Sequence, residues 1–132
     1  MEPKSKVDST KTRLDHEPPD VTSKFGWCYH HLGIPTDSHK PSEKYLKDLK
    51  MYVSGFDKSP YGIEWMRFEP DSPVSDLVKT VPHIAFEVEN LDTALKGKEM
   101  VGEISSPSDG VRVAMILDNE ALIEFIEFSK KQ

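Results

Sequence analysis

The fold is decided by two short stretches of sequence, His31-Leu-Gly-Ile at residues 31–34 and His83-Ile-Ala-Phe at residues 83–86. Each stretch has a His, an apolar residue, a small residue and a second apolar residue in the same order. A second matching pair is Tyr61-Gly-Ile-Glu-Trp-Met-Arg-Phe and Ala121-Leu-Ile-Glu-Phe-Ile-Glu-Phe. The sequence therefore contains an internal repeat: each half opens with a strand that carries a His and closes with a strand that carries a Glu.

Side chains alternate between the two faces of a strand, so these stretches also predict which residues share a face. In the first stretch, His31 and Gly33 point one way and the two aliphatic residues point the other way. In the second stretch, His83 shares its face with Ala85 and Glu87. If a pseudo-twofold axis relates the halves, the polar faces bring two His and two Glu together in a concave cavity.

Around these stretches the pattern predicts strands interleaved with one short helix per half, which is an α+β fold. A helix is expected at 43–50, where Tyr45, Leu46 and Leu49 share one face, and a second helix is expected after Asn90. The expected strands are 26–34, 51–56 and 61–68 in the first half, and 81–88, 99–105, 111–118 and 121–128 in the second half.

Length and composition limit the classes of protein that this chain can be. It has 132 residues, enough for one domain, and 17 basic against 23 acidic side chains give a net charge of −6. That charge argues against binding to duplex nucleic acid or to anionic lipid. The lone Cys28 excludes an internal disulfide, and no apolar stretch reaches the roughly 18 residues of a membrane span. We therefore expect a soluble, cytoplasmic protein with a single domain.

The chain divides into a polar segment and one folded domain. Residues 1–24 contain few aliphatic side chains, so we expect a flexible tail. The folded domain is expected at 25–132, and the proline-containing connector 69–80 separates one module at about 25–70 from another at about 81–128.

With these features the sequence resembles the vicinal oxygen chelate superfamily, and most closely its glyoxalase I and methylmalonyl-CoA epimerase branches. The resemblance covers residues 26–128. Its most specific part is Val81-Pro-His-Ile-Ala-Phe-Glu-Val-Glu-Asn-Leu, followed by Ile123-Glu-Phe-Ile-Glu. The resemblance implies two tandem βαβββ modules that form a cup-shaped mixed sheet around one divalent metal ion.

The resemblance also implies the ligands of that ion, which lie on the first and last strands of each half. By position these are His31, Glu64, His83 and Glu124. Two imidazoles and two carboxylates suit Zn, Ni, Co, Fe(II) or Mn, so the ligand set leaves the identity of the metal open. The resemblance further implies that Glu64 or Glu124 moves a proton, and Glu124 is preferred because its module is complete.

The first module departs from the family pattern in length. From the expected end of its helix at Lys50 to Glu64 is 64 − 50 = 14 residues, whereas from Gly97 to Glu124 is 124 − 97 = 27 residues. We therefore expect the first module to be shortened by about one strand and its turn.

Several alternatives stay open at this point. A one-residue shift in register would turn His30 inward in place of His31. The leading hypothesis is a metal-dependent lyase, isomerase or epimerase that transfers a proton on a small substrate with vicinal oxygens. The alternatives are a metal-free binding protein of the bleomycin-resistance type and, third, a metal-dependent dioxygenase. Apolar sheet edges in so small a cup also predict a homodimer.

Overall fold

The two strands that carry the His stretches pair with each other at the centre of the fold. In the computed structural model, β1 (Cys28–Pro35) runs antiparallel to β5 (His83–Glu87). On their other sides, β1 pairs in parallel with β4 (Ile63–Phe68), and β5 pairs in parallel with β8 (Ala121–Phe128). The last strand of each half therefore lies beside the first strand of the same half, which is the symmetry that the sequence repeat predicts.

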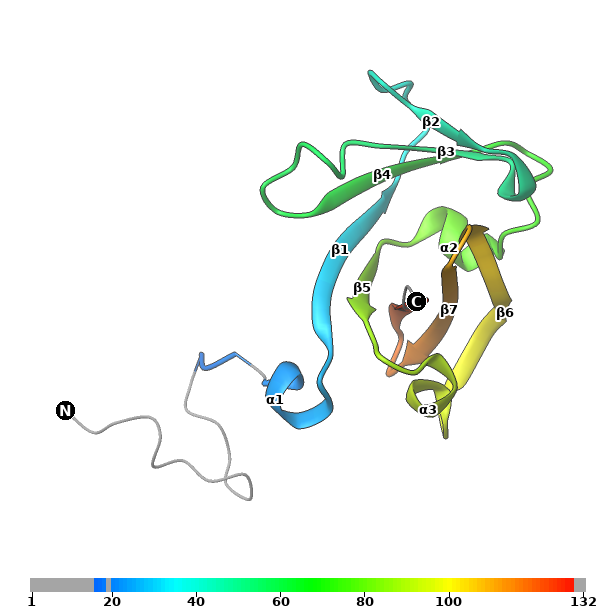
Figure 1. The fold of residues 1–132 in the computed structure, drawn as a ribbon. Helices are drawn as coiled ribbons and strands as arrows, with labels where there is room; N and C mark the ends of the chain where they lie inside the picture. Colours follow the sequence, from blue (N-terminus) through cyan, green and yellow to red (C-terminus); the bar gives the residue numbers. More distant parts are fainter. Residues whose placement is uncertain (1–15, 19, 130–132) are drawn as a thin grey trace.

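The structure describes residues 16–18 and 20–129, and within them eight strands form one sheet in the order β2-β3-β4-β1-β5-β8-β7-β6. The sheet curls into a cup (Figure 1), which confirms the predicted α+β class and cup-shaped mixed sheet. The outer strands are β2 (Lys44–Leu46), β3 (Met51–Ser54), β6 (Glu99–Ser108) and β7 (Val111–Asp118). The helices are α1 (Val21–Phe25), the 3₁₀ helix η2 (Lys47–Leu49), α2 (Asp76–Thr80) and α3 (Leu91–Leu95).

Helix α3 covers the outer face of the second half. Its predicted start is confirmed, because the Asn90 side-chain oxygen accepts a hydrogen bond from the Thr93 N–H at 2.9 Å. Behind the helix lies a hydrophobic core of buried residues, Val88, Leu91, Ala94, Ala114, Ile116 and Phe125. The apolar face of the strands therefore packs outward on α3 and leaves the opposite face for the cup.

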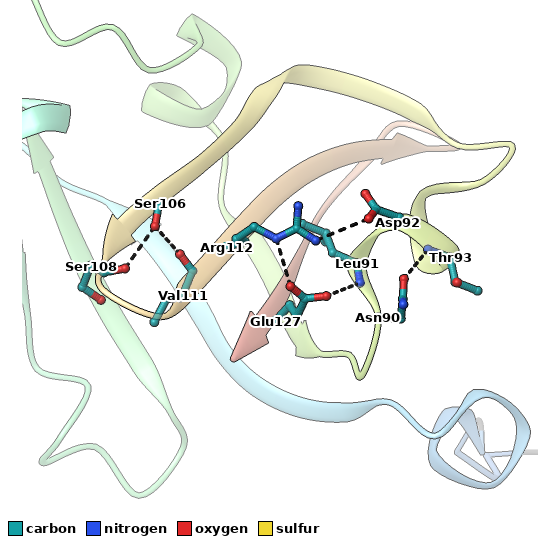
Figure 2. A network of polar contacts seen from close by, with 9 residues as sticks. All are labelled: Asn90, Leu91, Asp92, Thr93, Ser106, Ser108, Val111, Arg112 and Glu127. Carbon is teal, nitrogen blue, oxygen red and sulfur yellow. Dashed lines mark hydrogen bonds and ion pairs between the residues drawn. The ribbon is translucent and has the colours of Figure 1, made fainter. Parts of the chain in front are cut away.

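Glu127 on β8 ties α3 to the sheet (Figure 2). One of its carboxylate oxygens accepts a hydrogen bond from the Leu91 N–H at 2.9 Å, and the other accepts one from Arg112 Nε at 2.9 Å. Arg112 also lies 3.5 Å from the carboxylate of Asp92 in the helix. The first N–H groups of a helix have no partner within it, so Glu127 satisfies one of them and anchors the helix.

The helix predicted at 43–50 is wrong, because the chain forms β2 and the 3₁₀ helix η2 there. Tyr45 pairs with Tyr52 of β3, with the ring centroids 4.8 Å apart, and its hydroxyl donates to Glu69 at 2.7 Å. Lys50 then turns the chain with a left-handed φ of 50°. A helix this short is not stable by itself, so pairing with β3 decides the conformation of the segment.

The expected loss of a strand from the first half is also wrong, because β1 to β4 are all present. The first half is nevertheless shortened, since β2 and β3 have three and four residues whereas β6 and β7 have ten and eight. Residues 36–43 connect β1 to β2, and their side chains contact the outer face of the sheet. The Lys40 ammonium lies 4.6 Å from the centre of the Trp65 ring, and the Glu43 carboxylate accepts two hydrogen bonds of 2.8 Å from Arg67. A loop thus occupies the position on the first half that α3 occupies on the second half.

The connector between the halves contains α2, capped by the Ser75 hydroxyl, which accepts a hydrogen bond from the Leu77 N–H at 3.2 Å. Val78 of α2 is buried in a second hydrophobic cluster with Met51, Met66 and Leu122. This cluster draws on strands of both halves, so α2 packs where the two halves meet.

Part of the predicted tail at 1–24 is described. Helix α1 lies at its end, where the Asp20 carboxylate accepts a hydrogen bond from the Ser23 N–H at 3.1 Å. Residues 1–15 and 19 lie outside the described residues, so the tail stays a prediction. Among the described helices none has the length and hydropathy needed to cross a membrane.

Candidate metal centre

Four polar side chains on the four central strands meet inside the cup. The strand pairing explains why, because it places them in two rows. Glu64 and His83 flank Gly33 in one row, since both pair with it across the sheet. His31 and Glu124 flank Ala85 in the same way in the other row. Each row therefore has one His, one Glu and one small residue between them, and the small residue leaves room for the larger side chains above it.

The distances between these side chains are short. His83 Nε2 lies 2.9 Å from Glu124 Oε1, and His31 Nε2 lies 3.2 Å from the same oxygen. The two Nε2 atoms are 3.3 Å apart, and His31 Nε2 is 3.4 Å from Glu64 Oε1. His31, His83 and Glu124 are all buried, and the Glu64 side chain is 23% exposed.

This arrangement fits a divalent metal ion. Imidazole and carboxylate atoms bind Zn²⁺ at about 2.0–2.2 Å, and ligand atoms around such an ion are then about 3 Å apart. One atom each of His31, His83 and Glu124 forms a group within 4.8 Å that can hold an ion. Two imidazole nitrogens directed at each other and at one carboxylate oxygen are better satisfied by a shared cation than by a single proton.

Gly33 sets the position of the His83 ring. A Cβ atom added at Gly33 would lie 2.2 Å from His83 Cε1 and 2.6 Å from Nε2, far inside van der Waals contact. The ring therefore lies directly over the bare backbone of β1. His83 Nδ1 is buried and has no hydrogen-bond partner among the described residues, so packing on Gly33 and the contact of Nε2 with Glu124 orient this imidazole.

His31 is oriented differently, by its neighbour His30. The pairing of β1 with β5 shifts register between Tyr29 and His31, and this irregularity lets both His30 and His31 line the cup. The two Nδ1 atoms are 2.8 Å apart, and the His30 ring stacks on Phe56 with ring centroids 4.9 Å apart. Burial, and the nearby charge of His31, lower the pKa of His30. His31 therefore faces inward as expected, and His30 lines the cavity beside it and does not replace it.

The two carboxylates have different electrostatic environments. Burial alone would raise the pKa of Glu124, but its hydrogen bonds with His31 and His83 outweigh burial and lower the pKa to about 2. Burial likewise opposes the charge of His31, yet the contact with Glu124 raises its pKa. At Glu64 burial dominates and raises the pKa. Glu124 is thus held ionised by the histidines, whereas Glu64 is the better proton acceptor.

The four side chains line a cavity of about 880 Å³, which is the size that ligand-binding pockets commonly have. The rest of its lining is mostly apolar and comes from β2, β3, β4, β6, β7, β8, the 3₁₀ helix η2, the β3–β4 loop and the segment around α2. The sequence identified the polar residues of this wall but missed the apolar ones. Phe56 and the apolar residues of β6 belong to no repeat, so no signal marked them.

Several other cysteine, histidine and aromatic side chains lie away from this centre. Cys28 is exposed, and the His39 side chain is 81% exposed. Trp65 and Tyr52 are not part of the cavity lining. They contact Lys40 and Arg67 instead.

Comparison with solved structures identifies proteins that have a similar fold. The structure is similar to a hypothetical protein from Bacillus halodurans C-125 with a TM-score of 0.59 and 17% sequence identity, over 80% of this chain and 97% of that one. It is also similar to methylmalonyl-CoA epimerase from Mycobacterium tuberculosis, with a TM-score of 0.54 and 20% identity over 78% of this chain and 89% of that one.

The chain therefore shares the fold of these proteins, as expected from the resemblance of its sequence to the vicinal oxygen chelate superfamily. No protein-family model matches the sequence, and no curated protein matches it closely enough to be reported.

Proposed function

We propose that this protein is a metal-dependent lyase or isomerase of the glyoxalase or epimerase type. It would transfer a proton on a small substrate whose vicinal oxygens face the metal centre. The observation that carries the proposal is the convergence of two imidazoles and two carboxylates, one from each central strand, on the wall of a large cavity. The fold supports it, because an epimerase is among the similar structures.

In this proposal His31, His83 and Glu124 hold the ion, because among the described residues they are the buried group whose ligand atoms lie close together. When bound, the ion supplies Lewis-acid stabilisation of negative charge on the substrate oxygens. The depressed pKa of Glu124 suits a permanent ligand, since this carboxylate stays ionised at neutral pH. The cavity walls would orient the substrate toward these residues.

Glu64 is the proposed base, although the resemblance also places it among the ligands and the sequence favoured Glu124 for proton transfer. Glu64 contacts His31 at 3.4 Å, lies outside the group of three and is more exposed than Glu124. Its raised pKa makes it the stronger acceptor of the two. Glu64 would take the proton from one oxygen-bearing carbon of the substrate and deliver it to the adjacent carbon on the same face, which completes an isomerisation.

Metal content tests the ligand assignment. Untagged protein is reconstituted in turn with Ni, Zn, Co, Mn or Fe(II) and measured by elemental mass spectrometry, and we expect about one ion per chain. His83→Ala should lose this ion, whereas His39→Ala, a matched control at an exposed histidine, should keep it. Retention of the ion by His83→Ala would defeat the assignment.

A pair of isosteric variants tests the base. Glu64→Gln should keep the metal but slow exchange of the substrate C–H proton with solvent deuterium by roughly 100-fold or more. Glu124→Gln should lose metal and exchange together. NMR detects the exchange across a panel of 2-hydroxy ketones, 2-oxo acids and thioesters. Unchanged exchange in Glu64→Gln would remove Glu64 from the mechanism.

The second candidate function is metal-free binding of a small molecule. The size of the cavity and its mostly apolar lining favour it, because these features serve a binding protein as well as an enzyme. Failure to bind any of the five metals stoichiometrically would support this function.

A further inference from the structure

The cavity extends well beyond the metal centre, and its far walls are apolar. Three of the chain's five Met residues, Met51, Met66 and Met115, line it, together with Leu49 and Val101. Methionine side chains adapt their shape to an irregular partner better than branched ones do. A volume of about 880 Å³ also far exceeds the need of a small chelating group, since a cavity of roughly 150 Å³ already accommodates benzene.

The charges of the lining restrict what can occupy this space. Among the described residues that line the cavity, Lys44 is the one Lys or Arg, and it is exposed. The acidic residues are Glu103, Glu64 and Glu124, and the whole chain carries a net charge of −6. A substrate with a phosphate-rich or polycarboxylate body would find little to neutralise it here.

Large apolar side chains remain exposed along the same cavity. Phe56, Ile104 and Phe128 line it and are still 37%, 39% and 41% exposed. They come from the β3–β4 loop, β6 and β8, so they lie on both halves of the cup. An apolar molecule that extends from the metal centre between these side chains would remove their surfaces from water, and this burial would strengthen its binding.

We propose that the site takes substrates with two parts: a small head with vicinal oxygens at His31, His83 and Glu124, and an uncharged alkyl or aryl body of roughly six to ten carbons in the apolar part of the cup. This inference rests on the proposed function for the head group. The inference about the alkyl or aryl body rests separately on the apolar lining of the cavity and on the charges of its side chains.

Hydroxamates test the two parts together, because they present vicinal oxygens to a metal and carry a chain of chosen length. The probes are acetohydroxamate and octanohydroxamate, titrated into Ni-loaded protein by calorimetry. Each buried methylene strengthens binding by about fourfold. Burial of only three of the six additional methylenes in octanohydroxamate therefore predicts about 60-fold tighter binding. Equal affinity for the two hydroxamates would overturn the proposal and leave the metal centre standing.

Neighbouring residues on β6 provide a matched pair of variants. Val101 lines the cavity, whereas Met100 does not and is 41% exposed. Val101→Asp should remove most of the preference for octanohydroxamate and leave acetohydroxamate binding unchanged. Met100→Asp should leave both affinities unchanged. A preference that survives Val101→Asp in folded protein, checked by circular dichroism, would show that the chain binds elsewhere and would overturn the proposal.

A metal-free measurement separates this inference from the proposed function. N-phenyl-1-naphthylamine is uncharged, lacks vicinal oxygens and fluoresces in apolar surroundings. Protein without metal should enhance its fluorescence, and Val101→Asp should reduce that enhancement at least fivefold while Met100→Asp does not. If no metal binds but this result holds, the proposed function fails and the apolar body site stands. No enhancement in the unsubstituted protein would overturn the apolar body site.

Discussion

The two halves of the molecule have the same strand arrangement but are supported in different ways. In the second half, α3 packs on the outer face and Glu127 anchors it to β8. In the first half, the loop at 36–43 takes that place, with Lys40 over Trp65. The four polar side chains nevertheless come from equivalent positions on the central strands. The comparison shows that the central strands β4-β1-β5-β8 position the site, and that the outer support can differ.

The two histidines repeat this contrast at the scale of single side chains. His83 is oriented by packing on Gly33 and has an unpartnered Nδ1, whereas His31 is oriented by the Nδ1 of His30 at 2.8 Å. The orientation of the His83 ring therefore depends on the lack of a side chain at Gly33, whereas the orientation of the His31 ring depends on the side chain of His30. Substitutions at these two supports should have distinct effects.

The largest effect is expected from Gly33→Ala. The new Cβ would overlap the His83 ring, so metal affinity should fall by roughly 100-fold and the free energy of unfolding by about 1–3 kcal/mol. Calorimetry and urea unfolding measure the two quantities. A double-mutant cycle on the free energy of unfolding provides the control. In the His83→Ala background, Gly33→Ala should lower the free energy of unfolding only slightly, because the ring that the new Cβ would overlap is absent. An undiminished loss of unfolding free energy in that background would show that the His83 ring does not lie over Gly33.

A smaller effect is expected at His30. His30→Phe keeps the stacking on Phe56 but removes the nitrogen that contacts His31, so metal affinity should fall by about 10-fold. His30→Asn places an oxygen near the position of Nδ1 and should restore part of the affinity. Equal metal affinities for the two variants would show that His30 does not orient His31 through this contact.

The pH dependence of the metal-free protein should be smaller still. The contact with Glu124 raises the pKa of His31 in the folded state, so its contribution to stability is complete below pH about 6.5 and is lost as pH rises through the raised value. The melting temperature should therefore fall by a few degrees between pH 6 and 9, as followed by circular dichroism. Glu124→Gln should flatten this slope.

Metal binding should show the opposite trend with pH. Protons compete with the ion for His31, so metal affinity should rise over the same pH range. An affinity that does not change with pH would contradict the assignment of His31 as a ligand.

The smallest effects are expected at the outer supports. Glu127→Gln weakens the contact between β8 and α3, and Arg67→Met breaks the pair with Glu43 in the first half. Both should lower the melting temperature by a few degrees at most and leave metal affinity unchanged. A large loss of metal in either variant would show that the outer supports do position the site.

Much of this arrangement could be predicted from the sequence, because it depends on strand periodicity. The repeated His and Glu mark the strands that pair at the centre, and alternation correctly placed Gly33 on the face of His31. The segment 43–50 was mispredicted, since apolar residues three and four apart also suit a short strand followed by a 3₁₀ turn.

Other features depend on pairing between strands that are distant in the sequence, so no local sequence pattern predicts them. The bulge that turns both His30 and His31 inward arises only when β1 pairs with β5. The apolar lining of the cup joins residues of β3, β6 and β7 that share no sequence pattern. The homodimer and the cytoplasmic location stay predictions.

Anomalous diffraction from crystals loaded with Ni or Zn, measured at the metal absorption edge, locates the ion itself. We expect one peak per chain, about 2.0–2.2 Å from His31 Nε2, His83 Nε2 and a carboxylate oxygen of Glu124. A peak at another position, or none in crystals grown with excess metal, would contradict this ligand assignment.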